Sequence, residues 1–395
     1  MNHRTPAVAA AALLAATVAC RDGANPRSLT PVPVLRDSAG VHIAENPRPP
    51  AGSGLGWEVG PEPAVRIGSA DGEDPYLFHR VWDMATLGNG RIAVADAGSE
   101  ELRVFDSMGV HLATWGGRGE GPGEFQSLWA VARWPGDSVA AWEFHSERGV
   151  SIFDSEGDLG RILRYATAST RTDVTVLRNS AILTDREVRS DRGRGLQVRH
   201  RLYQLLDAEG TVTASLGPYP ASEMFERRRA GTTVWMEVPF TRSAVTAAWH
   251  DLAVVGRNDI YEIRAYGTDG ALRRMVRMDH APVPVTRSLL TLEQEEQGLG
   301  PGDDEIPAPE TLPAFDRVIA DALDHLWVRE YRVPGRDTPH PLWTVFDPEG
   351  RVLGHVATPP GLGIFEIGEG YVLGLAIRDL GVQQVQVWPL RRGEG

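Results

Sequence analysis

Short apolar runs separated by turn residues recur along most of the chain. Residues 91–125 show the unit, because 92–94 and 102–105 are two runs of strand type joined by turn residues. A third run, 111–115, follows a turn at 106–109, where Asp can accept backbone hydrogen bonds and Gly can take a positive φ. The pattern predicts one antiparallel meander in about 30 residues.

The turn at 106–109 recurs later in the chain. An apolar residue, Asp, two variable residues and Gly follow one another from Phe153, Leu206 and Phe346, and Tyr266 keeps the spacing with Gly in place of Asp. The interval between these turns is about 50 residues at first and longer afterwards, which is typical of propeller blades with loop insertions. A lone meander leaves an apolar face uncovered, so we expect similar sheets on both sides of it.

Six groups of strands follow from this spacing. We expect them at residues 81–115, 128–164, 173–216, 244–278, 315–346 and 364–390. The last group holds three strands, and residues 64–67 are expected to supply the fourth from the other end of the chain. The predicted fold is all-β: a six-bladed β-propeller of four-stranded antiparallel blades over residues 63–392, with the last blade closed by an N-terminal strand.

Two segments between these groups are expected to depart from the repeat. Residues 217–242 are predicted to form a polar loop. Residues 285–313 are predicted to be an insertion, with one short helix where Leu289, Leu290 and Leu292 precede a run of Glu residues. The insertion is a candidate lid over one face of the propeller.

The N-terminal residues form a class of their own. Arg4 precedes an apolar run at 7–16, and small residues follow it, so we expect an export signal at 1–19 that is too short to span a bilayer. Residues 18–20, Val-Ala-Cys, resemble the lipobox of bacterial lipoproteins, with Thr17 where that family usually has Leu.

The lipobox resemblance implies cleavage before Cys20 and attachment of lipid to its sulfur. We therefore expect residues 20–62 to form a lipid-anchored tether and edge segment, with an edge strand at 41–44, and the protein to reside in the cell envelope, in the periplasm or at the outer membrane. The alternative is plain secretion with a free thiol, because Cys20 is the only cysteine in the chain.

The charge balance narrows the function classes. Acidic residues outnumber basic ones, 53 to 40, for a net charge of −13, so nucleic acid is not an expected partner. All 40 basic residues are Arg, which excludes Schiff-base chemistry and a phosphate-loop lysine. The His residues show no zinc-binding spacing, and no G-x-S-x-G motif is present.

With these repeats in place, the chain resembles the six-bladed β-propellers of the NHL type. The match is carried by residues 92–96, by 102–106 and by the Gly-rich run 116–125, which ends in Phe and corresponds to the family's link between blades. It resembles in particular the exported bacterial propeller lipoproteins, in which a segment like 36–41 precedes the first blade. The resemblance implies a binding platform in most members and lyase or lactonase activity in a few.

Acidic side chains recur at matching places in the predicted blades. They stand at the ends of second strands and in first strands, so a ring would gather them on one face around the channel. Each of them either caps its own turn or contributes to a divalent cation site, for example for Ca²⁺, because hard cations take convergent carboxylates. These residues are Asp96, Glu143, Asp185 and Glu330 in second strands, and Asp83, Asp173 and Asp316 in first strands.

Arginine concentrates in the third predicted blade and in the loop after it. Either these side chains are solvated surface, or they form a docking patch for an acidic partner or an anionic lipid. The residues of this patch are Arg186, Arg189, Arg192 and Arg194, followed by Arg227, Arg228 and Arg229, with Trp235 nearby.

The tryptophans divide into two predicted groups. Trp134, Trp235 and Trp249 are candidates for stacking on a sugar or a peptide. Tryptophans that stand in predicted strands are expected to fill the core between blades, and these are Trp82, Trp129, Trp142, Trp327 and Trp388.

These patterns favour a monomeric binding or scaffold module for a peptide, protein or glycan. The alternative is a metal-dependent hydrolase or lyase that uses carboxylates at the central channel, although no catalytic residue can be assigned. A scaffold should show dispersed charges and an exposed aromatic patch, whereas an enzyme should show converging carboxylates or His side chains.

Overall fold

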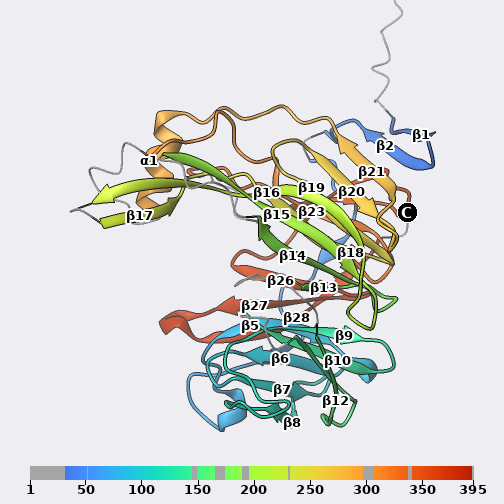
Figure 1. Ribbon diagram of the computed structural model, residues 1–395, viewed down its shortest axis with the longest axis vertical. Helices are drawn as coiled ribbons and strands as arrows, with labels where there is room; N and C mark the ends of the chain where they lie inside the picture. The colour runs from blue at the N-terminus through green and yellow to red at the C-terminus, as the bar shows by residue number, and fades with distance from the viewer. Residues whose placement is uncertain are drawn as a thin grey trace, which may run out of the picture. The chain divides into compact units, whose positions relative to one another are not determined.

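Antiparallel strands dominate the structure (Figure 1). The computed structural model describes residues 32–50, 52–144, 149–164, 174–188, 195–229, 232–296, 306–336 and 340–393, and for 227–229 it describes the backbone alone. Pro33–Gly395 form one compact unit.

Within the described residues the strands form six sheets. The first sheet contains β5 (Val81–Thr86), β6 (Ile92–Asp96), β7 (Glu101–Phe105) and β8 (His111–Gly116). The second contains β9 (Leu128–Trp134), β10 (Ser138–Glu143), β11 (Val150–Phe153) and β12 (Leu159–Leu163). The third contains β13 (Val174–Val176), β14 (Ile182–Val188), β15 (Leu196–Leu206), β16 (Val212–Arg229) and β17 (Thr232–Glu237).

The remaining three sheets include strands from the N-terminal part of the chain. The fourth contains β18 (Ala244–Trp249), β19 (Leu252–Arg257), β20 (Glu262–Tyr266) and β21 (Leu272–Met278), with β2 (Val41–Asn46) and β1 (Val34–Ser38) beyond β21. The fifth contains β22 (Phe315–Ala320), β23 (Leu326–Glu330), β24 (Leu342–Phe346) and β25 (Val352–Ala357). The sixth contains β26 (Leu362–Ile367), β27 (Tyr371–Ile377) and β28 (Gln383–Arg391), with β4 (Val65–Ile67) and β3 (Glu58–Val59) paired to β28.

The first strands of neighbouring sheets contact one another in a closed cycle. β5 contacts β9, β9 contacts β13, β13 contacts β18, β18 contacts β22, β22 contacts β26, and β26 contacts β5. Apolar clusters lie between adjacent sheets, for example one that joins Phe125 and Phe153 to Leu102, and another that joins Tyr261 to Phe315. The all-β prediction is confirmed, and the arrangement is that of a β-propeller, in which each sheet buries its faces against its neighbours.

The predicted Asp-x-x-Gly turns adopt the expected geometry. Asp106 Oδ1 accepts hydrogen bonds from the backbone N–H groups of Met108 and Val110, both at 2.8 Å. Asp154, Asp207 and Asp347 accept bonds from the same relative positions.

The glycine of each such turn also packs against another sheet. Gly109 has φ +84°, and a Cβ there would lie 3.0 Å from side-chain carbons of Val65 and Ile67. Gly157 has φ +92°, and a Cβ there would lie 2.1 Å from the indole nitrogen of Trp115. The motif therefore closes a hairpin and also allows two sheets to approach closely.

The predicted ring closure is confirmed at the level of strand pairing. β4 pairs antiparallel with β28 in the register Val65↔Val387, Arg66↔Gln386 and Ile67↔Val385. Ile67 is buried and packs with apolar residues of β5, β7 and β28. An N-terminal strand thus completes the sheet that the C-terminal segment begins.

The N-terminal segment makes more contacts with the sheets than the sequence suggested. β2 pairs parallel with β21, and β1 pairs antiparallel with β2. The Asn46 side chain donates hydrogen bonds to the carbonyls of Arg277 at 3.0 Å and Gly350 at 2.9 Å. Leu55 N–H donates to the His355 carbonyl at 3.0 Å. Residues 41–50 and 52–67, here called the N-terminal strap, therefore contact three successive sheets, and strands occupy part of the segment that we expected to be a tether.

The expectation of a polar loop at 217–242 is wrong. β16 and β17 fill most of this segment and extend the third sheet to five strands. Pro218 and Pro220 lie within β16 and are opposite Leu202 and His200 of β15; Pro220 stands beside a register shift, where a missing N–H is tolerated. The short helix predicted in the insertion is confirmed as α1 (Arg287–Glu296), with Thr286 Oγ1 accepting a bond from Leu289 N–H at 3.3 Å.

Candidate functional site

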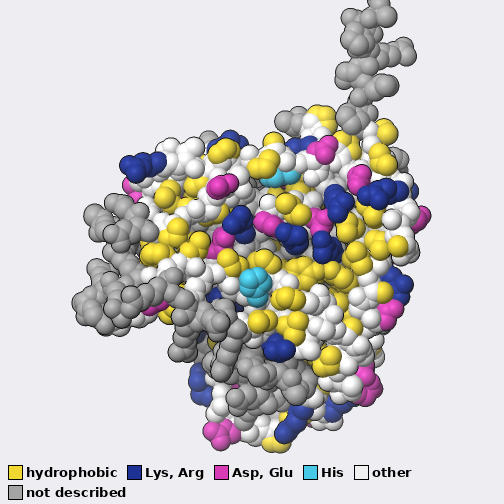
Figure 2. All heavy atoms as spheres, turned by 45° about the horizontal axis from the view of Figure 1, so that its top comes forward, with side chains coloured by type: hydrophobic (Ala, Val, Ile, Leu, Met, Phe, Trp, Pro, Cys, Tyr) yellow, Lys and Arg dark blue, Asp and Glu magenta, His cyan; other side chains and the backbone are white. Residues whose placement is uncertain are grey.

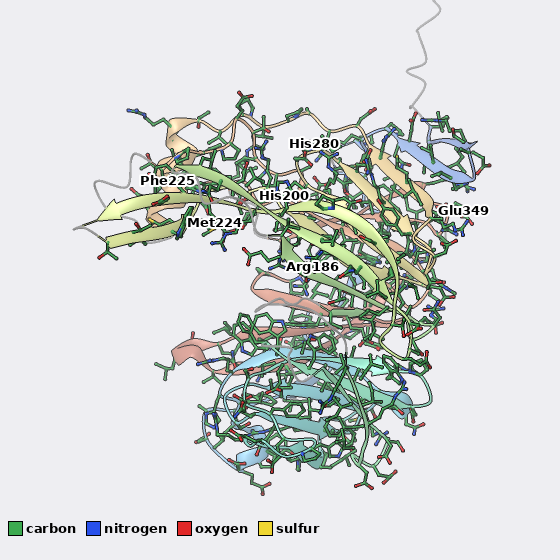
Figure 3. All side chains as sticks on the ribbon, viewed as in Figure 1. Arg186, His200, Met224, Phe225, His280 and Glu349 are labelled. Atoms are coloured by element: carbon green, nitrogen blue, oxygen red, sulfur yellow. The ribbon has the colours of Figure 1, made fainter. Side chains whose placement is uncertain are left out.

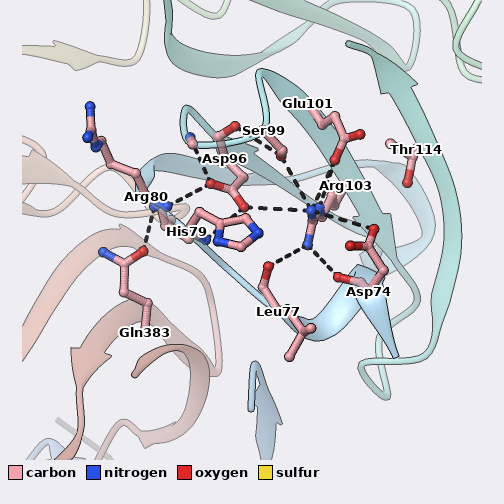
Figure 4. Close-up of polar contacts among 12 residues, drawn as sticks. Asp74, Leu77, His79, Arg80, Asp96, Ser99, Glu101, Arg103, Thr114 and Gln383 are labelled. Atoms are coloured by element: carbon pink, nitrogen blue, oxygen red, sulfur yellow. Dashed lines mark hydrogen bonds and ion pairs between the residues drawn. The ribbon is translucent and has the colours of Figure 1, made fainter. Parts of the chain in front are cut away.

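Asp96, at the end of β6, is held by its own loop. It is fully buried, and its carboxylate accepts backbone hydrogen bonds from His79 at 3.0 Å, Arg80 at 2.7 Å and Gly98 at 3.0 Å (Figure 4). The buried Arg103 guanidinium lies 3.9 Å away. Asp96 therefore anchors the entry to β5 and the turn after β6.

The other second-strand carboxylates also have protein partners. Glu143 accepts from the backbone of Gln126 at 2.6 Å and Ser127 at 3.2 Å, and Asp185 lies 3.1 Å from Arg201 Nε. Glu330 accepts from Arg48 Nη2 at 2.8 Å and from Thr344 Oγ1 at 2.6 Å. Among the described residues, no group of three His, Cys, Asp or Glu side chains lies together in a way that could hold a metal ion.

The first-strand carboxylates lie in two different surroundings. Asp316 accepts from Arg329 Nε at 2.6 Å. Asp83 accepts from the backbone of Met84 at 2.9 Å and Val131 at 3.1 Å, which joins β5 to β9. Asp173 lies outside the described residues.

The carboxyl group of Asp83 has a pKa near neutral. Burial raises the pKa of Asp83 to about 7, although its backbone hydrogen bonds and the Arg317 guanidinium oppose the shift. Arg317 also lies over the Phe365 ring, at 5.4 Å from its centre. A carboxyl of this kind beside a guanidinium can exchange a proton at pH 7, which is a property of general acid and base groups.

We expect Asp83→Asn to change how stability depends on pH. The pKa of Asp83 in the folded state lies above its ordinary value of 3.8, so protonated Asp83 favours the folded state. This contribution to stability is complete below pH 3.8 and is lost as the pH rises to about 7. Stability of the variant relative to the unchanged protein should therefore rise by about 2 kcal/mol between pH 4.5 and pH 8; the full shift corresponds to about 4 kcal/mol, and partial exposure of Asp83 lowers it.

Urea unfolding at several pH values measures this trend. Asp379→Asn, at an exposed turn, is the matched control and should show no such slope. A pH-independent difference for Asp83→Asn would contradict the raised pKa.

A β-bulge recurs near the start of the first strand in three sheets. The pairing with the second strand skips Trp82 in β5, Trp129 in β9 and Asp316 in β22. A bulge turns the skipped side chain to a new direction, so these residues occupy equivalent positions opposite the ends of the second strands.

The bulges produce an exposed aromatic surface. The Trp82 ring lies 4.7 Å from the Trp129 ring, and the Trp129 ring lies 4.8 Å from the Phe144 ring, measured between centres. Trp82 is 42% exposed. Our expectation that Trp82 fills the core is therefore wrong, because the bulge, which leaves no signal in the sequence, turns its side chain outward.

Exposed aliphatic side chains lie on the hairpin next to this aromatic surface. Leu380 is fully exposed and Ile377 is 67% exposed, both beside the turn between β27 and β28. Gln383, which pairs with Ile377, accepts a hydrogen bond from the Val81 N–H at 2.7 Å, so this hairpin lies against the start of β5. Trp82, Trp129, Phe144, Ile377 and Leu380 are here called the apolar rim.

The three tryptophans that we predicted to stack on ligands are buried or half-buried in strands. Trp134 and Trp249 are buried, and Trp249 Nε1 donates to the Asp324 carbonyl at 2.7 Å, so the stacking prediction is wrong for both. Trp235 is half-buried in β17, opposite Glu226 of β16. Trp134 is the last residue of β9 and Trp249 is the last residue of β18.

The arginine patch is described only in part. Arg186 lies on β14, and Figure 3 shows it below His200 of β15, while Met224 and Phe225 mark the extended part of β16. The side chains of Arg227, Arg228 and Arg229 lie outside the described part of the structure, as do Arg189, Arg192, Arg194 and Cys20. The docking role of this patch stays a prediction.

Comparison with known proteins identifies the fold and no family. No family model and no curated protein matches the chain. A protein of Bacteroides fragilis described as exported has a similar solved structure, with 13% identity, a TM-score of 0.51, and coverage of 89% of this chain and 100% of that one.

Two enzymes with lower TM-scores are also similar. A gluconolactonase of Xanthomonas campestris has 14% identity, a TM-score of 0.40, and coverage of 79% of this chain and 87% of that one. A virginiamycin B lyase of Staphylococcus aureus has 9% identity, a TM-score of 0.38, and coverage of 78% of each chain. No helix among the described residues is sufficiently long and apolar to cross a membrane.

Proposed function

We propose that this chain is an exported, monomeric, six-bladed β-propeller of the NHL type that acts as a binding module for a protein or peptide partner. The apolar rim carries the proposal, because a fully exposed Leu beside a cluster of partly exposed aromatic rings is a feature of partner-binding surfaces. The acidic side chains support the same interpretation, since Asp96 and Glu143 accept backbone hydrogen bonds of their own sheets and Glu330 is paired with Arg48.

A protein or peptide fits the rim better than a glycan. Aromatic rings stack on both sugars and peptides, but the aliphatic side chains of Ile377 and Leu380 offer a sugar no hydrogen bond. Apolar side chains of a peptide would instead remove these groups from water. A glycan ligand is therefore one outcome that the binding experiment must distinguish.

The test uses defined ligands and two variants. Peptides selected from a random dodecapeptide library against the protein should bind about tenfold more weakly to the Trp82→Ala, Leu380→Ser double variant, a loss of about 1.4 kcal/mol. Met108→Ser removes an exposed apolar side chain at a different turn and should leave affinity unchanged. Equal affinity for both variants, or selective binding of muropeptides in place of peptides, would contradict the proposal.

Lipid anchoring at Cys20 is part of the proposed function. The lipobox-like residues 18–20 support it, and residues 20–33 would then connect the lipid to β1. Replacement of Cys20 by Ser should release the protein from the membrane fraction of expressing cells and abolish labelling by a radioactive fatty acid. Retention of the Cys20→Ser variant in membranes would show that another feature holds the protein there.

An enzymatic role is the second candidate, and Asp83 favours it. Its pKa of about 7 beside Arg317 suits a general acid or base in a hydrolase or lyase. A divalent cation such as Ca²⁺ belongs to the same proposal, as does the insertion acting as a lid. EDTA should then lower the melting temperature and excess Ca²⁺ should restore it, whereas an unchanged melting curve would remove the cation.

A further inference from the structure

A surface pocket lies beside the fifth sheet, separate from the apolar rim. It has a volume of about 420 Å³, within the range of small-molecule sites, and here it is called the arginine cleft. The N-terminal strap contributes one wall through Arg48; His280, before the insertion, and Leu312, at the end of the insertion, contribute a second. Residues of β22 and β23, the segment that follows β23 and the start of β24 complete it.

Arginine side chains outnumber acidic ones in the lining of the arginine cleft, on a strongly acidic protein, and one of them, Arg332, is paired with Glu296 of α1 at 3.3 Å. Four Arg side chains line it against the carboxylates of Asp316 and Glu330; they are Arg48, Arg329, Arg332 and Arg336. Figure 2 shows one face of the molecule, on which Arg side chains lie in a group among acidic and apolar ones. With a net charge of −13 for the whole chain, a local excess of guanidinium groups marks a place that attracts anions.

Two of these guanidinium groups are held in fixed orientations. Arg329 donates through Nε to Asp316 at 2.6 Å and lies over the Trp343 ring, 5.9 Å from its centre. Arg48 donates to Glu330 at 2.8 Å, and its Nη1 lies 3.3 Å from His280 Nδ1. Preorganised guanidinium groups bind a carboxylate with little loss of side-chain freedom.

Other donors in the cleft are available to a ligand. Among the described residues, the Arg329 guanidinium is ion-paired with Asp316 through Nε, and no hydrogen bond engages its Nη atoms. No hydrogen bond or ion pair of the described residues engages the guanidinium of Arg336. Burial and the neighbouring Arg48 lower the pKa of His280, so its neutral ring can accept from Arg48 at pH 7. Figure 3 places His280 on the chain that follows β21, beside the strap.

The rest of the cleft is apolar. Val283, Leu312, Pro313, Val333 and Leu342 line it, and Leu342 is 39% exposed. An anion without an apolar part would leave these walls in water, so the ligand needs an apolar chain. Asp316 and Glu330 would repel a dianion more strongly than a monoanion, which favours a carboxylate over a phosphate.

We propose that the arginine cleft binds a small monocarboxylic acid with an unbranched apolar chain. The guanidinium groups of Arg329 and Arg336 bind the carboxylate, and the chain lies against Leu312 and Leu342. This site is additional to the apolar rim, and neither requires the other.

Octanoate is the probe, measured by isothermal titration calorimetry on the folded chain from residue 21 onward. We expect saturable binding that weakens about tenfold in the Arg329→Gln, Arg336→Gln double variant and in Arg336→Gln to a smaller extent. Arg378→Gln, at an exposed hairpin elsewhere, should bind like the unchanged protein. If the double variant melts early, the single exposed change Arg336→Gln decides the question.

The ligand series separates the parts of the proposal. Octanol, acetate and octyl phosphate should each bind at least about tenfold more weakly than octanoate. Octanol lacks the charge, acetate lacks the apolar chain, and octyl phosphate carries a second negative charge. Failure of octanoate to bind at millimolar concentration would overturn the proposal. Unchanged binding in both Arg variants, or tighter binding of octanol or octyl phosphate, would do so as well.

Discussion

Ile67→Asp should remove most of the stability of this protein. Ile67 is 1% exposed and packs with Val81, Phe105 and Val385, so the change removes apolar contacts and buries a carboxylate without a partner. The two effects together should cost at least about 5 kcal/mol, which is comparable with the whole stability of many domains. Urea unfolding followed by tryptophan fluorescence measures the loss.

The neighbouring residue supplies the control. Arg66 lies in the same strand with its side chain exposed, so Arg66→Asp should change stability by no more than about 0.5 kcal/mol. Ile67→Val keeps the packing and should cost about 1 kcal/mol, which gives a measurable value if the Asp variant does not fold. Similar stabilities for Ile67→Asp and Arg66→Asp would mean that β4 does not close the ring in solution.

Asp321→Ala should cost about 3–5 kcal/mol. This buried carboxylate accepts hydrogen bonds from Trp327 Nε1 at 2.9 Å, from Arg392 Nη1 at 2.7 Å and from the backbone of Leu323 and His325, both at 2.9 Å. Its removal leaves the indole and the Arg392 guanidinium without this acceptor between the fifth and sixth sheets. Thermal and urea unfolding should both show the loss.

Asp106→Ala is the matched control for Asp321→Ala. Asp106 makes the same two backbone bonds in its turn but is not bonded to a tryptophan or an arginine among the described residues, so its loss should cost only about 1 kcal/mol. Equal costs for the two variants would show that the bonds to Trp327 and Arg392 contribute little.

The Asp321 carboxylate should also make the protein less stable at acidic pH. Burial alone would raise the pKa of Asp321, but the hydrogen bonds from His325, Trp327 and Arg392 outweigh it and hold the pKa below its ordinary value of 3.8. A lowered pKa stabilises the folded state above that value, and the stabilisation is lost as the pH falls through the lower, folded-state pKa. Asp321→Ala should therefore lose less stability in acid than the unchanged protein.

The repeating turns made much of the fold predictable from sequence. Asp-x-x-Gly sets a hairpin through local hydrogen bonds, so its recurrence at Asp106, Asp154, Asp207 and Asp347 located successive sheets without knowledge of tertiary contacts. The shortage of one strand at the C-terminal end then pointed to β4. Both inferences depend on backbone chemistry that is visible in a few adjacent residues.

The two proposed binding surfaces were less predictable because they depend on register and on contacts between distant segments. Trp82 is exposed only because the pairing of β5 with β6 skips it, and such a bulge has no sequence signal. The arginine cleft joins Arg48 to Glu330 across 282 positions, which no local pattern reveals.

The strap has a consequence for the order in which the molecule can assemble during synthesis. Gly68, just after β4, is bonded to Gln384, 316 positions later, so one of the first strands to be made must wait for the last one, β28. A nascent chain leaving the ribosome cannot bury Ile67 until translation is nearly complete. Completion of the ring is therefore slow and comes late in folding. Until then an unpaired strand edge is exposed, and we expect chaperones to protect it from aggregation.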